Sequence, residues 1–161
     1  VRLPTEAEWE RAAAYPPHLP GGSSRAGRRE YPWGKWTDRE QAEASPIPAH
    51  TSESGLRDPS AVGIFPHGAA ACGAEELAGN VWEWCSSRYQ AYPLPPNLPA
   101  ETYDTYRRRK REKRGYVLRG GSWLNSRDRA RCACRNVFNP GYDFDHYGFR
   151  LARLFSLSSS S

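Results

Sequence analysis

The sequence has no methionine, only three lysines against 20 arginines, and no apolar run close to the roughly 18 residues that a membrane-spanning helix needs. The lack of such a run excludes a transmembrane helix within this fragment. Because the first residue is Val1, we expect that residues of the natural protein precede it. The preference for arginine over lysine fits a GC-rich genome and a thermophilic source.

Cysteine is scarce as well, and its spacing argues against a zinc motif. Cys72, Cys85, Cys132 and Cys134 form no CxxC pair and have no histidine at zinc-ligand spacing. A disulfide between distant cysteines stays open.

Familiar catalytic motifs are also missing. The four histidines lie apart, and none falls in a Ser, Cys or Asp motif of nucleophilic catalysis. The stretch RGGS, residues 119–122, lacks both the lysine and the following helix of a phosphate-binding loop. Residue chemistry alone therefore identifies no catalytic constellation.

Positive charge is present in excess, with a net charge of +5 and a basic run, YRRRKREKRG, at residues 106–115. Such a run could bind phosphate groups. It has no interleaved aromatic residues and no helical face, which favours a solvated loop. We therefore do not expect nucleic acid as a partner.

Regular structure is expected to be sparse, within one domain at residues 1–155 and a disordered tail at 156–161. A helix is predicted in LPTEAEWERAAA, because Thr5 and Glu8 have the spacing of a capping box and Pro16 ends the segment. Short strands are expected at residues 61–65, 79–85, 116–123, 130–135 and 148–155.

In the stretch NVWEWC, a strand would place Trp82 and Trp84 on one face and Glu83 on the other. If Glu83 is buried, its carboxylate needs a partner. Two partners are consistent with the sequence: an arginine, or a hard cation held together with Glu76 and the carbonyls near Gly79.

Seven blocks resemble, in order, those of the formylglycine-generating-enzyme (sulfatase-modifying factor) family, and they span residues 2–153. They are RLPTEAEWERAA, YPWG, AVGIFPHGA, LAGNVWEWC, VLRGGSW, RCACR and GFRLAR. The resemblance implies an α+β fold of the C-type-lectin-like kind, with a small twisted antiparallel sheet, few helices and extensive loops.

The same resemblance bears on chemistry. The family's copper-binding cysteines would fall at Asn125 and Ala130, so we predict that the protein is not an enzyme and requires no cofactor. The family's structural calcium site would correspond to Glu76, Gly79, Val81 and Glu83. A structural calcium ion is therefore an expectation that rests on the resemblance.

The fold also resembles that of the variable proteins of diversity-generating retroelements, in which adenine-directed mutagenesis rewrites a block between RGGSW and GFR. Codons of the type NNC cannot encode Lys, Glu, Gln, Met or Trp. None of these occurs at residues 124–147, although they make up 23 of the first 123 residues. Residues 54–74 lack them too, so the absence alone is modest support.

The segment 124–147 is therefore predicted to be a hypervariable surface that binds an unknown ligand, expected to be a protein, on a monomeric domain. Aromatic residues give contact area, and small polar residues adapt. The alternative is a degenerate or active domain of the enzyme family whose aromatic residues pack in the interior. The predicted ligand-binding residues are Leu124, Asn125, Ser126, Arg129, Cys134, Asn136, Val137, Phe138, Gly141, Tyr142, Phe144, Asp145, His146 and Tyr147, with Tyr142, Phe144 and Tyr147 as anchors.

Overall fold

The structure is a computed structural model that describes residues 1–17, 27–37, 46–89 and 115–153. It contains one α-helix, α1 (Glu6–Ala14), and the strands β1 (Trp82–Arg88), β2 (Tyr116–Arg119), β3 (Asn136–Phe138) and β4 (Tyr147–Gly148). Nearly all of the basic run and the predicted disordered tail lie outside the described residues. Within the described ranges, no helix is both long and apolar enough to span a membrane.

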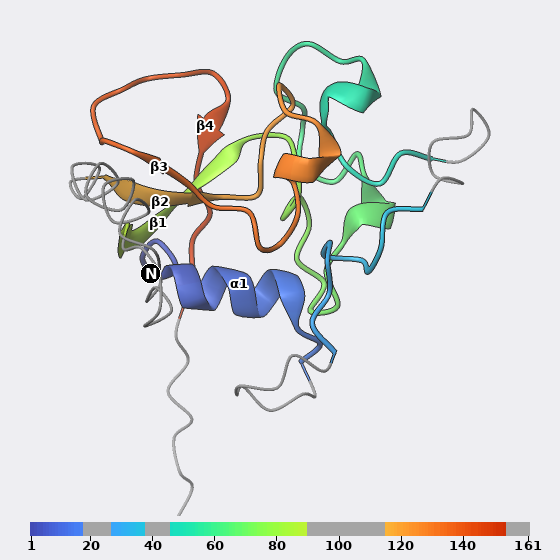
Figure 1. The fold of residues 1–161 in the computed structure, drawn as a ribbon, viewed down its shortest axis with the longest axis horizontal. Helices are drawn as coiled ribbons and strands as arrows, with labels where there is room; N and C mark the ends of the chain where they lie inside the picture. The colour runs from blue at the N-terminus through green and yellow to red at the C-terminus, as the bar shows by residue number, and fades with distance from the viewer. Residues whose placement is uncertain (18–26, 38–45, 90–114, 154–161) are drawn as a thin grey trace, which may run out of the picture.

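The helix α1 forms where the sequence predicts it. The Thr5 hydroxyl accepts a hydrogen bond from the Glu8 backbone N–H (3.2 Å), and the Glu8 carboxylate accepts one from the Thr5 N–H (2.8 Å). These two bonds complete the predicted capping box. Trp9, Ala13 and Ala14 are buried against the sheet, which lies directly above α1 in Figure 1.

The sheet has the strand order β3-β2-β1-β4. The pairs β1·β2 and β2·β3 are antiparallel, whereas β1·β4 is parallel. The prediction of an antiparallel sheet is therefore wrong for one pair, and the sheet is mixed. The loop after β3 carries the chain across to the outer edge of β1, where β4 runs in the same direction as β1 (Figure 1).

Several predicted strands are turns. Gly63 (φ 92°), Gly79 (φ 80°) and Asn80 (φ 60°) have left-handed backbone that a strand cannot contain, so residues 61–65 are irregular and β1 begins only at Trp82. Residues 130–135 also form turns. In the predicted strand 148–155, only Gly148 belongs to β4, and Ala152 forms a single bridge with Arg2.

The core joins α1 to the sheet around a buried arginine. Trp9, Leu77, Val117 and Cys132 belong to one buried cluster. Arg119 is fully buried, and its guanidinium donates to the carboxylate of Glu10 (2.7 Å) and to the carbonyl of Cys132 (2.6 Å). The fold thus rests on polar bonds as well as apolar packing.

Candidate ligand-binding surface

The predicted variable segment separates into two places on the molecule. Residues 124–129 follow β2 and form a turn near residues 52–54, where the carbonyl of Asn125 accepts a hydrogen bond from the Ser52 N–H (3.0 Å). Residues 139–146 form the loop between β3 and β4. Figure 1 shows this loop at the upper left, well apart from the orange turn after β2.

Three rings form what we call the aromatic box: Phe138 at the end of β3, and Tyr142 and Phe144 of the β3–β4 loop. Tyr142 and Phe144 are stacked, with 4° between their planes and 6.2 Å between their centroids. Phe138 stands nearly perpendicular to both, at 84° to Tyr142 and 86° to Phe144, with centroid distances of 5.1 and 5.7 Å. Edge-to-face pairs at such distances are favourable.

The box is open to solvent on the outside and continues into the protein on the inside. Tyr142 is 57% exposed and Phe144 is 40% exposed. The half-buried Tyr147 contacts Phe138 (5.4 Å) and Phe144 (5.2 Å) and reaches Trp84 of β1 (5.8 Å). Sequence analysis did not predict that Trp84 adjoins this site. The available indication was its position on β1, two residues after Trp82.

The base of the loop is held firmly by the sheet. The N–H of Trp82 donates to the carbonyl of His146 (2.8 Å), and Gly148 pairs with Glu83. A Cβ atom on Gly148 would lie 2.8 Å from Cγ2 of Val81, so the strand approaches closely because this residue is glycine. The aromatic box therefore stands on a fixed platform.

Acidic groups flank the rings. Asp143 and Asp145 are exposed, and the carboxylate of Asp145 lies 2.9 Å from Nδ1 of His146. The His146 ring packs against Tyr147 at 4.6 Å and Phe144 at 5.3 Å. Burial raises the pKa of Tyr147, so its hydroxyl is neutral at physiological pH. Sequence analysis did not single out Asp143.

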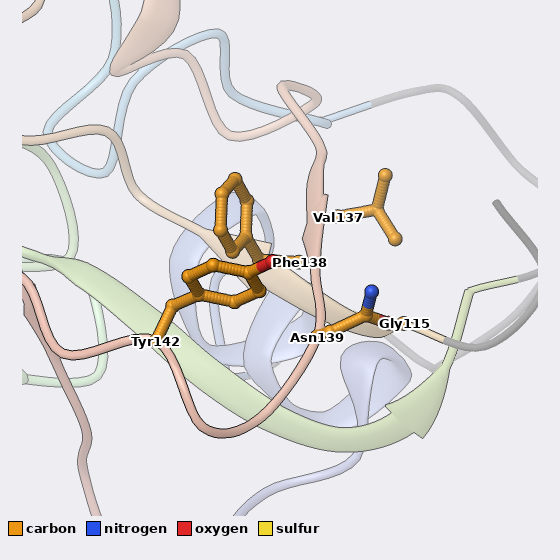
Figure 2. A pocket seen from close by; sticks show the side chains of 5 residues that line it. All are labelled: Gly115, Val137, Phe138, Asn139 and Tyr142. Atoms are coloured by element: carbon orange, nitrogen blue, oxygen red, sulfur yellow. The ribbon is translucent and has the colours of Figure 1, made fainter.

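A pocket of about 290 Å³ adjoins the box where β2 begins and β3 ends. Its lining residues are Gly115, Val137, Phe138, Asn139 and Tyr142. Figure 2 shows the rings of Phe138 and Tyr142 together on one side and Val137 on the other. Sequence analysis predicted three of these five residues and missed Gly115 and Asn139.

Two of the remaining predicted residues form hydrogen bonds with their neighbours in the chain. The Asn125 side chain accepts from the backbone N–H (3.1 Å) and hydroxyl (2.9 Å) of Ser122. The Asn136 side chain accepts from the Val137 N–H (2.9 Å). Leu124, Ser126, Arg129 and Gly141 are exposed, and Cys134 is half-buried.

Glu83 pairs with an arginine in this structure. Its carboxylate accepts from Nε (2.5 Å) and one terminal nitrogen (2.6 Å) of Arg150, and from the indole N–H of Trp9 (2.7 Å). A guanidinium already neutralises this carboxylate, so Glu83 does not fit a cation site well.

Glu76 differs from Glu83. One of its carboxylate oxygens accepts from the Gly63 N–H (3.3 Å), and the other is buried without a partner. Burial raises the pKa of this carboxyl group. In the described part of the chain, no three His, Cys, Asp or Glu side chains are grouped to hold a metal. Calcium at Glu76, Gly79, Val81 and Glu83 stays a prediction.

The four cysteines are free thiols in this structure. Burial raises the pKa of Cys85 and of Cys132 to about 12 each. An unfolded cysteine ionises near pH 9, whereas these two buried thiols stay protonated up to about pH 12. Below about pH 9 the thiols are protonated in both states, so the folded state loses nothing. As the pH rises from about 9 toward 12, ionisation of the thiols favours the unfolded chain. We therefore expect stability to fall above about pH 9.

Thiol labelling tests the burial of Cys85 and Cys132. With Ellman's reagent at neutral pH, exposed Cys72 and half-buried Cys134 should react in the native protein, and Cys85 and Cys132 only after unfolding. Rapid reaction of all four thiols without denaturant would contradict the burial of Cys85 and Cys132.

Comparison with known proteins identifies the family. The profile of the sulfatase-modifying factor enzyme 1-like domain matches residues 1–155. The chain belongs to this family. A hercynine oxygenase of Mycolicibacterium thermoresistibile is 40% identical over 158 residues, which cover 94% of this chain and 31% of that protein. A formylglycine-generating enzyme of Thermomonospora curvata is 36% identical over 161 residues, covering 94% of this chain and 48% of that enzyme.

Among solved structures, Treponema denticola variable protein 1 has a TM-score of 0.59 and 28% identity, covering 92% of this chain and 45% of that one. This likeness confirms the predicted α+β, C-type-lectin-like fold. The chain spans only about a third of the hercynine oxygenases and about half of the formylglycine-generating enzyme.

The prediction that the protein is not an enzyme is contradicted by its relatives in the sulfatase-modifying factor family. Hercynine oxygenases from Mycolicibacterium thermoresistibile and Mycobacterium tuberculosis are 40% and 38% identical to this chain. The prediction rested on Asn125 and Ala130 at the positions of a copper-binding cysteine pair. Because one fold hosts many chemistries, the residues at two positions could not exclude an enzyme.

Proposed function

We propose that this chain is the substrate-recognition part of an enzyme of the sulfatase-modifying factor family, and that the aromatic box binds a cationic group of the substrate. The observation that carries the proposal is the stacked pair Tyr142 and Phe144, which remains open to solvent at 57% and 40% exposure. Two stacked rings that are exposed in this way are accessible to a ligand. The relation to hercynine oxygenases supports an enzymatic setting.

The chemistry of the box favours a cation. A cation within about 6 Å of a ring centroid is attracted by the ring's negative face, and the gain is about 0.5–2 kcal/mol per contact. The centroids of Phe138, Tyr142 and Phe144 are 5.1 to 6.2 Å apart, so one bound group can contact more than one of them. Asp143 and Asp145 add negative charge at the rim.

Binding of choline tests the proposal, with hercynine as a second ligand because the relatives are named for it. We expect Phe144→Ala to weaken choline binding about 2- to 30-fold, since one ring contact is lost. Phe144→Leu should weaken it similarly, because leucine restores apolar area but not the π face. Phe149→Ala is the matched control, because Phe149 is an exposed phenylalanine (66%) outside the aromatic box.

A neutral ligand of the same shape as choline, 3,3-dimethylbutan-1-ol, separates charge from shape. It should bind more weakly than choline to the unchanged protein. Isothermal calorimetry gives both affinities. Equal affinity for the two ligands, or unchanged choline binding in Phe144→Ala, would show that the box does not recognise cations.

A second candidate function is a binding surface diversified by a retroelement, which the likeness to a variable protein at 28% identity favours. The mixture of aromatic, acidic and small residues in the β3–β4 loop suits that role. Sequencing the DNA around the gene tests it. A near-identical repeat with adenines wherever codons 124–147 differ, beside a reverse transcriptase gene, would support diversification. Lack of any repeat would remove this candidate.

A further inference from the structure

The pocket at the edge of β3 is distinct from the exposed face of the aromatic box, although Phe138 and Tyr142 belong to both. It lies where β2 begins, between Gly115 and the residues that end β3 (Figure 2). Its volume is about 290 Å³. For comparison, an apolar cavity of about 150 Å³ is large enough to bind benzene.

We infer that this pocket is a second binding site and that it takes an uncharged aromatic ring with one hydrogen-bonding group, such as a phenol or an indole. The inference goes beyond the proposed function, because it concerns a neutral ring instead of a cation. It does not require the protein to be an enzyme.

The lining explains the class of ligand. Val137, Phe138 and Tyr142 offer apolar and aromatic walls, and the side-chain amide of Asn139 offers both a donor and an acceptor. None of the described lining residues carries a charge. An anionic ring would lose hydration without gaining a partner, whereas a neutral ring with one polar group matches both kinds of wall.

Gly115 determines the shape of this edge. A Cβ atom there would lie 2.5 Å from Cγ2 of Val137 and 2.8 Å from the carbonyl oxygen of Phe138. Glycine therefore allows the start of β2 and the end of β3 to approach closely, and Gly115 itself adds no side chain to the pocket.

An added peptide strand fits this edge less well than a small ring. Such a strand would pair with free backbone groups of β3, the last strand in the order β3-β2-β1-β4. The N–H of Val137 is already bonded to the side chain of Asn136 at 2.9 Å. The donor that strand addition needs at Val137 is therefore occupied, and the pocket remains the accessible feature.

The test measures binding of indole and of phenol to the 161-residue chain by NMR chemical-shift titration, with choline titrated in parallel. We expect Asn139→Trp, which places a ring over the pocket from an exposed position, to weaken indole binding at least about tenfold. It should leave choline affinity within about twofold. Phe144→Ala should show the reverse pattern, because Phe144 belongs to the box and does not line the pocket.

A second variant keeps the inference testable if Asn139→Trp fails to fold. Asn139→Leu removes only the amide, so phenol should bind more weakly while benzene binding is unchanged. Two outcomes would overturn the inference: no saturable binding of indole or phenol, or equal binding to the unchanged protein and Asn139→Trp. Choline binding with no indole binding would refute the pocket alone, and indole binding with no choline binding would refute the proposed function alone.

Discussion

Replacing Arg150 with alanine is expected to lower the free energy of unfolding by about 3–5 kcal/mol, the range seen when one partner of a buried ion pair is removed. The side chain of Glu83 is only 6% exposed, and Arg150 supplies two of its three hydrogen bonds. Without the guanidinium, the Trp9 indole alone would face a buried negative charge. The cost arises mainly from that unpaired charge.

The matched control is Arg2→Ala. Arg2 also forms a bidentate pair, with Glu8, but the two side chains are 41% and 36% exposed. Solvent screens surface pairs of this kind, so they contribute little to stability. Urea unfolding of both variants gives the comparison, and similar losses for Arg150→Ala and Arg2→Ala would contradict a special role for burial.

A double variant separates the charge from the packing. Adding Glu83→Gln to Arg150→Met removes the buried charge, so the pair of changes should cost less than the sum of the single ones.

Because Arg150 lies two residues after β4, Arg150→Ala should also weaken choline binding by loosening the base of the β3–β4 loop. A stable variant with unchanged affinity would separate the ion pair from the site.

What the sequence could predict depended on how local each feature is. The capping box of α1 involves Thr5 and Glu8, three residues apart, and it formed as expected. Strand alternation placed Glu83 on the face opposite Trp82 and Trp84, and its need for a partner could be inferred on the condition that this face is buried. The identity of that partner could not be predicted, because Arg150 is 67 residues away and alternation does not indicate which distant residue pairs with Glu83.

In the site, too, local features could be predicted from the sequence and the arrangement of distant residues could not. Composition indicated that residues 124–147 are unusual, and the aromatic anchors could be chosen from it. The arrangement of Phe138, Tyr142 and Phe144 depends on how the β3–β4 loop folds back on itself, which has no period to read. The separation of residues 124–129 from the box follows from the path of the chain after β2, and no local pattern encodes that path.

The second large loss of stability is expected when alanine replaces Gly79 and adds a single methyl group. A Cβ atom at Gly79 would lie 2.2 Å from the carbonyl oxygen of His50, and its φ angle is 80°. We expect Gly79→Ala to cost about 2–5 kcal/mol, the sum of about 1–2 kcal/mol for left-handed backbone and about 1–3 kcal/mol for overpacking.

Gly73→Ala is a close control, because Gly73 has a φ angle of 82° and no atom within 4 Å of the added Cβ position. Gly73→Ala should lower the free energy of unfolding only by the cost of left-handed backbone, about 1–2 kcal/mol. The difference between the two variants isolates the contact with His50.

The contact with His50 should be expensive because little around it can move. His50 is fully buried, and its ring nitrogens lie 2.9 Å from the Ser54 hydroxyl and 2.8 Å from the Asp58 carbonyl. Its own carbonyl accepts from the Asn80 N–H (2.7 Å), so a shift that admits the methyl group also strains the turn that leads into β1. Urea unfolding of the two alanine variants measures this. If Gly79→Ala lost no more stability than Gly73→Ala, the backbone at His50 would have to yield freely, and the rigid support inferred for this end of the sheet would be wrong.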